Sequence, residues 1–189
     1  MELLRTERIV LRPWAEGDLQ AYFEIYSRDE VARWLGHRPR RAVADLDEAA
    51  RQLKGWRDFH DRHEAPYGLW AIALISEPVE ASEAAEPTGP VGTALLLPLS
   101  DDDGPTDEIE VGWHLHPDYQ GRGLATESAR ALLAHLPPGA PDRVLALTDL
   151  DNTPSQAVAV RLGMVDQGQT DRWFGETMLQ YCWTRPLAA

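Results

Sequence analysis

The sequence has very little cysteine and very little lysine. Cys182 is the only cysteine in 189 residues, so neither an internal disulfide nor a cysteine-based zinc site can form. Lys54 is the only lysine, and Lys and Arg together number 18 against 31 Asp and Glu, which gives a formal net charge of -13. This charge excludes a typical nucleic-acid-binding protein, because contact with a phosphate backbone requires clustered positive residues. It favours a cationic partner such as a protonated amine.

Long hydrophobic runs are also missing. The sequence contains no stretch of about 18 apolar residues that could span a membrane, and residues 1–8 lack the apolar core of a signal peptide. Hydrophobic residues nevertheless make up 43% of the chain, which is enough for a sizeable core. We therefore expect a cytoplasmic protein without membrane association, folded as a single domain over residues 1–189.

Hydrophobic periodicity predicts a chain that alternates between strands and helices. Period-two alternation and short apolar runs indicate strands, whereas apolar residues three or four apart indicate helices. The predicted strands are 8–13, 68–75, 91–99, 108–116, 143–148 and 178–184. The predicted helices are 16–26, 45–63, 123–136 and 153–162. This order predicts an α/β fold with a mixed sheet and one crossover connection around residues 108–148.

Residues 76–90 differ from the rest of the chain in composition. They are acidic, interrupted by proline and nearly free of large apolar side chains. Such a segment buries too little surface to offset its ordering entropy, so we predict a mobile acidic loop between two strands.

The most informative stretch is 117–126, where a strand ends, two glycines follow at alternate positions and a helix begins. Gly121 and Gly123 allow a tight turn that points several backbone N–H groups the same way. The N-terminus of the following helix adds partial positive charge. The pattern predicts a main-chain cradle for an anion such as a diphosphate, although an ordinary strand-to-helix turn has the same spacing.

A dinucleotide-binding oxidoreductase is one alternative that this stretch leaves open. Gly121, Gly123 and Thr126 mimic the glycine fingerprint of that class, and Asp149 or Asp151 follows some twenty-odd residues later. Two features oppose it. A proline and three further residues separate the strand from the first glycine, and only about 60 residues remain for a doubly wound sheet.

Three segments together resemble the GNAT N-acetyltransferase superfamily. Residues 120–125, Gln-Gly-Arg-Gly-Leu-Ala, match its acetyl-CoA-binding signature. Residues 152–164 are similar to its Asn-x-x-Ser/Ala helix and Leu-Gly-Phe segment, with Met164 in place of phenylalanine. Residues 6–13 resemble the first strand of the ribosomal-protein N-terminal acetyltransferase branch, which also includes small-amine acetyltransferases. The resemblance extends from residue 6 to about residue 185 and implies a mostly antiparallel sheet with a splayed strand pair, flanked by helices.

The resemblance also implies where acetyl-CoA, as co-substrate, would bind. The backbone of Trp113, His114 and Leu115 would contact the pantetheine arm, which would pair with the exposed strand edge. Asn152 and Ser155 would bond the amide or sulfur region of pantetheine. The remaining residues implied at the cofactor, around its diphosphate, are Gln120, Gly121, Arg122, Gly123, Leu124, Ala125 and Thr126.

The reaction that the resemblance implies is direct attack of a neutral amine on the thioester. Glu110, on the strand that leads into the glycine segment, is the candidate base that accepts the amine proton, although an ordinary solvated strand carboxylate is equally consistent with its position. Many members of the family carry a tyrosine acid where this chain has Ala159. Ser155 would then assist the leaving thiolate as a hydrogen-bond donor. The missing tyrosine also keeps open a non-catalytic acetyl-CoA-binding protein of the same fold.

The acceptor would be a primary amine on a protein N-terminus or a small molecule. Trp34 and Trp56 could line its pocket by cation–π contact, although core packing is the simpler explanation, and Trp173 and Phe174 could border the entrance. His114 and His116 have a spacing that could bind a metal, but no third ligand is evident, so we predict none. A homodimer is common in the family, but nothing in the sequence demonstrates one.

Overall fold

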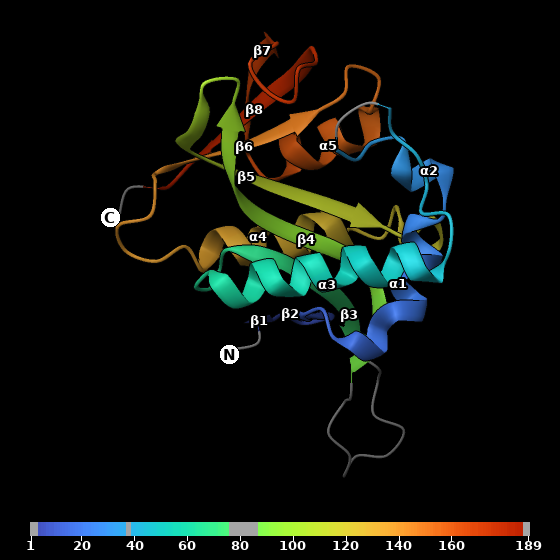
Figure 1. The fold of residues 1–189 in the computed structure, drawn as a ribbon. Coiled ribbons are helices and arrows are strands. Elements are labelled where there is room, and N and C mark those ends of the chain that lie inside the picture. The colour runs from blue at the N-terminus through green and yellow to red at the C-terminus, as the bar shows by residue number, and fades with distance from the viewer. Residues whose placement is uncertain (1–3, 37–38, 76–86, 187–189) are drawn as a thin grey trace.

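The computed structural model describes residues 4–36, 39–75 and 87–186. Within them, eight strands form one sheet in the order β1-β2-β3-β4-β5-β6-β8-β7; Figure 1 shows the sheet and its helices. The strands are β1 (Leu4–Arg5), β2 (Ile9–Pro13), β3 (Gly68–Ile75), β4 (Pro87–Asp101), β5 (Gly104–Leu115), β6 (Arg143–Thr148), β7 (Val165–Thr170) and β8 (Met178–Thr184). The α-helices are α1 (Leu19–Tyr26), α2 (Asp29–Ala32), α3 (Leu46–Arg62), α4 (Leu124–Ala134) and α5 (Thr153–Arg161).

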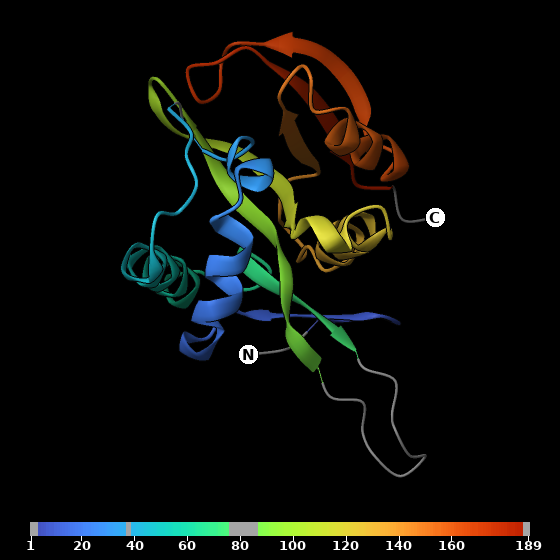
Figure 2. The same ribbon diagram turned by 90° about the vertical axis from the view of Figure 1, so that its right-hand side faces the viewer.

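The sheet is antiparallel except at the pair β5 and β6, which the crossover through α4 makes parallel. This confirms the mixed sheet and the crossover expected from the sequence. β5 and β6 are paired at a single position, Glu110 opposite Leu145, whereas β5 pairs with β4 along nearly its whole length. The two strands therefore diverge beyond Glu110, and Figure 2 shows β6, β8 and β7 turning away from the rest of the sheet.

Helices cover both faces of the sheet. In Figure 2, α1 and α3 lie on one side of the strands and α4 and α5 on the other. Alternate residues of β3 serve the two cores, because successive strand side chains point to opposite faces. Trp70 and Ile72 belong to the core that includes the buried leucines of α4, whereas Ala71 packs with residues of α1 and α3. One core packs α4 and α5 against one face of the sheet, and the other packs α1 and α3 against the opposite face.

Local signals in the sequence explain where the two helices that frame the site begin and end. Asp45 caps α3, since its carboxylate accepts a hydrogen bond from the Glu48 N–H at 2.8 Å. Asn152 caps α5 in the same way, through the Ser155 N–H at 3.3 Å. α5 is followed by Gly163 in the left-handed conformation, with φ of +79°, as expected for a glycine after a helix.

The structure differs from the expected elements in several places. The helix expected over 16–26 begins as a 3₁₀ turn, Glu16–Asp18, before α1. Sequence periodicity missed α2 and β1, which have only four and two residues. It also missed β7, whose first five residues are exposed, so that no buried face produces an alternating pattern.

The acidic loop expected over 76–90 is only partly within the described structure. Residues 76–86 lie outside the described residues. Residues 87–90 were expected in the loop, but they belong to β4, where Pro87 and Pro90 pair with Ile75 and Ala73 of β3. None of the helices in the described part of the chain is long and apolar enough to cross a membrane.

Candidate functional site

A cavity of about 840 Å³ lies where β5 and β6 diverge. Its walls come from both helix layers: α1, α2 and α3 on one side, and α5 with the first turn of α4 on the other. The cavity thus brings together most of the residues singled out from the sequence. Those that line it are Trp34, Trp56, Glu110, Trp113, His114, Leu115, Gln120, Gly121, Gly123, Leu124, Ala125, Thr126, Asn152 and Ser155.

The glycine segment before α4 adopts the backbone that the sequence predicted. Gly121 and Gly123 have φ of +73° and +80°, values that residues with a Cβ seldom adopt. Gly123 is the N-cap of α4 in the left-handed conformation. The first N–H groups of a helix have no partner inside the helix, so those of the residues after Gly123 are free to bind an anion. A Cβ built on Gly121 meets no atom within 4 Å, which leaves space beside the loop.

The side chains around these glycines have separate roles. The Gln120 amide donates to the Leu115 carbonyl at 3.1 Å and thereby ties the loop to the end of β5. Arg122 does not line the cavity; its guanidinium lies 5.1 Å from the centre of the Tyr119 ring. Thr126 lines the cavity, but its hydroxyl oxygen is buried, without a hydrogen-bond partner among the described residues. Arg122 thus contributes no side chain to the cavity lining, and Thr126 contributes only a buried hydroxyl.

The start of α5 forms the adjoining wall. Asn152 is buried and Ser155 half-buried, and both line the cavity together with Val158. Ala159, at the position where the resemblance implies a tyrosine acid, is fully buried in the core and is not part of the lining. The chain therefore offers no acidic side chain from this position.

Glu110 lies at the point where β5 and β6 separate, and its carboxyl group is drawn out of solvent. Burial raises its pKa from 4.5 to about 8, against the opposing effect of a hydrogen bond from the Leu147 N–H. The ionised form of a carboxyl group with a pKa in this range is a stronger base than an ordinary carboxylate, and its population grows as the pH approaches 8. Glu110 is half-buried and lines the cavity, so it is less solvated than a fully exposed strand carboxylate.

His114 lies two strand positions beyond Gly112 on the face of Glu110. Burial lowers its pKa to about 4, so the imidazole is neutral at physiological pH. Its Nδ1 lies 3.3 Å from the Tyr26 hydroxyl, which in turn lies 2.6 Å from the hydroxyl of Thr93. This chain of polar groups joins α1 to β4 and β5. The sequence gave no sign of it, because Tyr26 looked like an apolar-face residue of its helix.

The opposite wall of the cavity is aromatic. Trp56 of α3 packs edge-on against Tyr22 and Tyr26, with ring centres 5.0 and 5.2 Å away. Trp34, after α2, is half-buried and also faces the cavity. Trp173 is placed differently from our expectation: it is buried in the core beside Cys182, so Phe174 and not Trp173 reaches the lining.

A buried ionic cluster that the sequence did not reveal closes one edge of the cavity. The guanidinium of Arg40, in the segment before α3, contacts Asp149 after β6 at 2.6 Å and Glu176 before β8 at 3.0 Å. The same guanidinium donates to the carbonyls of Arg33 and Gly36. Three segments far apart in the sequence meet here, which is why no motif predicted the contact.

The two histidines with metal-like spacing point to different partners. His116 accepts a hydrogen bond from the Asp118 N–H at 3.3 Å, whereas His114 faces Tyr26. Within the described ranges, no group of three or more His, Cys, Asp or Glu side chains is arranged to hold a metal ion.

The observed topology does not support the dinucleotide-binding alternative. That class uses a doubly wound parallel sheet, with the glycine loop between two parallel strands of a βαβ unit. Here the glycine loop does lie between the parallel strands β5 and β6. All the remaining strand pairs in the described sheet are antiparallel, so the sheet is not doubly wound.

Comparison with known proteins agrees with the geometry. Residues 8–165 match the acetyltransferase (GNAT) domain family. YoaA, an uncharacterized N-acetyltransferase of Bacillus subtilis (strain 168), is 21% identical over 168 residues, which is 88% of this chain and 84% of YoaA. A GNAT-family acetyltransferase structure from Bordetella pertussis is 28% identical, with a TM-score of 0.68 over 98% of this chain and 100% of that one. The structure of RimL, a ribosomal L7/L12 α-N-protein acetyltransferase in complex with coenzyme A, has a TM-score of 0.72 at 18% identity, over 97% of this chain and 98% of RimL. The chain belongs to the GNAT family of acetyltransferases.

Proposed function

We propose that this protein transfers an acetyl group from acetyl-CoA to a primary amine by direct attack within a ternary complex. The observation that carries the proposal is the cavity at the divergence of β5 and β6. It joins a glycine-built main-chain cradle, a carboxyl group with a raised pKa and an aromatic wall in one continuous space.

The cradle suits a diphosphate without any lysine. The N–H groups of residues 121–125 would hold the two phosphates, helped by the positive end of the α4 dipole. Beyond Glu110 the edge of β5 is no longer paired with β6, so the backbone of residues 113–115 is available to the pantetheine arm. Asn152 and Ser155 would border the same arm. When bound, acetyl-CoA supplies an acetyl group activated as a thioester.

Glu110 would act as the base. An aliphatic amine is mostly protonated at neutral pH, and only the neutral form has a lone pair for attack. The Glu110 carboxylate accepts the ammonium proton, directly or through a water molecule, and the nitrogen then forms the new C–N bond. The nitrogen then loses its second proton, the C–S bond breaks and the departing thiolate takes up one proton through solvent, which leaves the amide and free CoA thiol. Ser155 would assist as a hydrogen-bond donor, since its hydroxyl is too weak an acid to give up a proton.

The aromatic wall would receive the acceptor. Trp34 and Trp56 offer ring faces that attract an ammonium group, and the protein as a whole is strongly acidic. Both features favour a cationic amine. A protein N-terminus and a small-molecule amine satisfy them equally, so the acceptor class is the primary amine in general.

An acceptor screen tests the proposal. Thiol release from acetyl-CoA would be measured with N-terminal peptides, polyamines and aminoglycosides, alongside calorimetric titration with CoA and with NADH. We expect CoA to bind, NADH not to bind, and at least one amine to be acetylated at its nitrogen, as verified by mass spectrometry. Binding of CoA without turnover on any amine would contradict the catalytic proposal and favour a non-catalytic acetyl-CoA-binding protein.

A further inference from the structure

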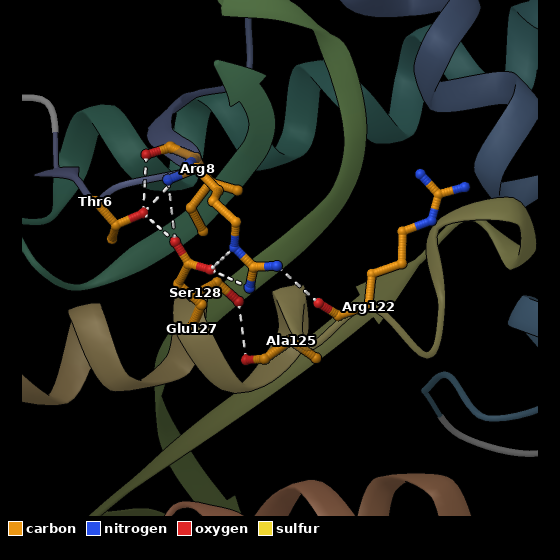
Figure 3. Close-up of polar contacts among 7 residues, drawn as sticks. Thr6, Arg8, Arg122, Ala125, Glu127 and Ser128 are labelled. Atoms are coloured by element: carbon orange, nitrogen blue, oxygen red, sulfur yellow. Dashed lines mark hydrogen bonds and ion pairs between the residues drawn. The ribbon is translucent and has the colours of Figure 1, made fainter. Parts of the chain in front are cut away.

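A polar cluster outside the cavity joins the start of β2 to the glycine loop (Figure 3). The Arg8 side chain contacts Glu127 of α4 with two of its nitrogens, Nε lying 2.8 Å from Oε2. Its third nitrogen, Nη1, donates to the Arg122 carbonyl at 3.0 Å. The hydroxyl of Thr6 and the Arg8 N–H also donate to Glu127. One side chain, that of Arg8, therefore holds both the first turn of α4 and the loop that precedes it.

The contact with Arg122 fixes the orientation of a peptide plane in the cradle. The Arg122 carbonyl and the Gly123 N–H belong to the same planar trans peptide, so they point in opposite directions. Because Arg8 holds the carbonyl on its own side, the Gly123 N–H points away from Arg8. Gly123 lines the cavity and Arg122 does not. The orientation of this peptide depends on ψ of Arg122 and φ of Gly123, and glycine leaves the second angle nearly unrestricted, so the hydrogen bond from Arg8 restricts the peptide to one orientation.

A second contact of Arg8, with the carboxylate of Glu127, neutralises a charge that would oppose an anion. Burial disfavours ionisation of Glu127, but the hydrogen bonds from Thr6 and Arg8 outweigh it and lower the pKa of the carboxyl below 4.5. Glu127 is therefore negatively charged at neutral pH, within the first turn of the helix that faces the expected diphosphate. Its charge is neutralised by Arg8, whose guanidinium contacts it directly.

We propose that Arg8 is a positioning residue for diphosphate binding: it holds the Arg122–Gly123 peptide with its N–H toward the ligand while it neutralises Glu127. The inference rests on the proposed function, since it assigns the glycine loop to the diphosphate of CoA. Arg8 itself does not line the cavity and touches no reacting group.

The test compares two ligands, only one of which carries the diphosphate. CoA has the diphosphate and the 3′-phosphoadenosine attached to it, and pantetheine has the same thiol arm without either group. Calorimetric dissociation constants for both would be measured with the wild type, Arg8→Met and Arg8→Lys. We expect Arg8→Met to weaken CoA by about tenfold, the effect of one misaligned hydrogen bond to a charged group, and to leave pantetheine unchanged. Arg8→Lys keeps the charge but lacks the fork that reaches both partners, so it should weaken CoA to a similar extent.

A matched control is Arg172→Met. Arg172 pairs with Asp101 at 2.9 Å, and the two side chains are 48% and 17% exposed, against 50% and 18% for Arg8 and Glu127. This pair joins β4 to the segment after β7 and lies outside the cavity lining. Arg172→Met should leave both dissociation constants unchanged, which excludes a general effect of losing a surface ion pair.

The possible outcomes distinguish a failure of the role of Arg8 from a failure of the proposed function on which it rests. A wild type that binds CoA no more tightly than pantetheine would contradict the diphosphate site itself. A wild type that prefers CoA, with Arg8→Lys retaining the full preference, would overturn the role of the Arg122 carbonyl. Equal weakening of CoA and pantetheine in both Arg8 variants would reduce Arg8 to a structural role. If Arg8→Met fails to fold, Arg8→Lys decides the question alone.

Discussion

The two sides of the cavity are built on different principles. On the side of α4 and α5, the ligand-facing groups are mainly backbone amides and helix starts, ordered by Gly121, Gly123 and Asn152. On the side of α1 to α3, they are side chains, above all the rings of Tyr26 and Trp56. A backbone site recognises features that do not vary, such as a diphosphate, whereas a side-chain site can change its ligand with few substitutions. The first side thus suits a constant donor and the second a variable acceptor.

Removal of Glu110, the proposed base at the junction of the two sides, should have the largest effect. In Glu110→Gln we expect kcat/KM to fall by about 100-fold or more, the usual contribution of a general base, without change in the dissociation constant of CoA. Wild-type kcat/KM should rise with pH until Glu110 ionises, at about pH 8. The ionisation of the amine acceptor affects the wild type and Glu110→Gln equally. The ratio of their kcat/KM values should therefore rise through the same pH range because Glu110 ionises in the wild type alone. Stopped-flow or steady-state thiol release measures both.

The control for this variant is Glu108→Gln. Glu108 precedes Glu110 by two strand positions but is not part of the cavity lining. The Glu108→Gln variant should keep the wild-type kcat/KM at every pH. Undiminished turnover in Glu110→Gln would remove Glu110 as the base and leave the neutral His114 or water in that role.

A change to the backbone side should affect CoA alone. Gly123→Ala places a Cβ on a residue with φ of +80°, which strains the backbone by roughly 1–2 kcal/mol. Relief of that strain turns the loop away from its binding conformation, so the dissociation constant of CoA should rise about tenfold. Gly139→Ala is the control, because Gly139 has φ of +87° in a loop remote from the cavity. Both variants should lose similar thermal stability, and a Gly139→Ala protein with equally weakened CoA binding would contradict the assignment.

A change to the aromatic side should affect only the acceptor. Trp56→Phe keeps an aromatic ring but reduces its face, and we expect the KM for the best amine of the screen to rise about three- to tenfold, within the range of one cation–π contact. The dissociation constant of CoA should stay constant. Trp183→Phe, half-buried and outside the lining, provides the comparison. Loss of CoA affinity in Trp56→Phe would break the division of the cavity into two independent sides.

The smallest effect concerns stability. A buried carboxyl whose pKa is raised from 4.5 to about 8 binds its proton more tightly in the folded state than in the unfolded state. The free energy of unfolding should therefore fall as the pH rises between these values. Glu110→Gln removes this dependence, so its melting temperature should exceed that of the wild type at pH 9 by more than at pH 5. Calorimetry at both pH values checks the sign, and equal differences would indicate a solvated Glu110.

The sequence predicted the backbone side far better than the side-chain side. Gly121, Gly123 and Asn152 act through local conformation, so their spacing along the chain carries the information. Tyr26 and the Arg40 cluster act through contacts between segments about 70 to 140 residues apart, as with Tyr26 and Thr93 or Arg40 and Glu176. Such contacts leave no periodic pattern in the sequence. The prediction for Trp173 failed in the opposite direction: it was expected at the entrance of the cavity but packs into the core.

The same distinction between local conformation and contacts of distant segments explains which elements of the fold were predicted wrongly. Strands such as 68–75 and 143–148 are buried along most of their length, and their bounds were predicted correctly. β7 is exposed and contains Gly168, so it forms only because β8 offers it a pairing edge. The small size of α2 likewise gives no room for a helical period. An element that forms only through pairing with a distant segment leaves no pattern in its own local sequence.

The most direct test of the account is a crystal structure of the protein with CoA. The account predicts that the diphosphate oxygens lie within hydrogen-bond distance of the backbone N–H groups between Gly121 and Ala125, with the pantetheine arm between β5 and β6. A diphosphate seated elsewhere on the protein, or held by side-chain cations with those N–H groups still free, would contradict it.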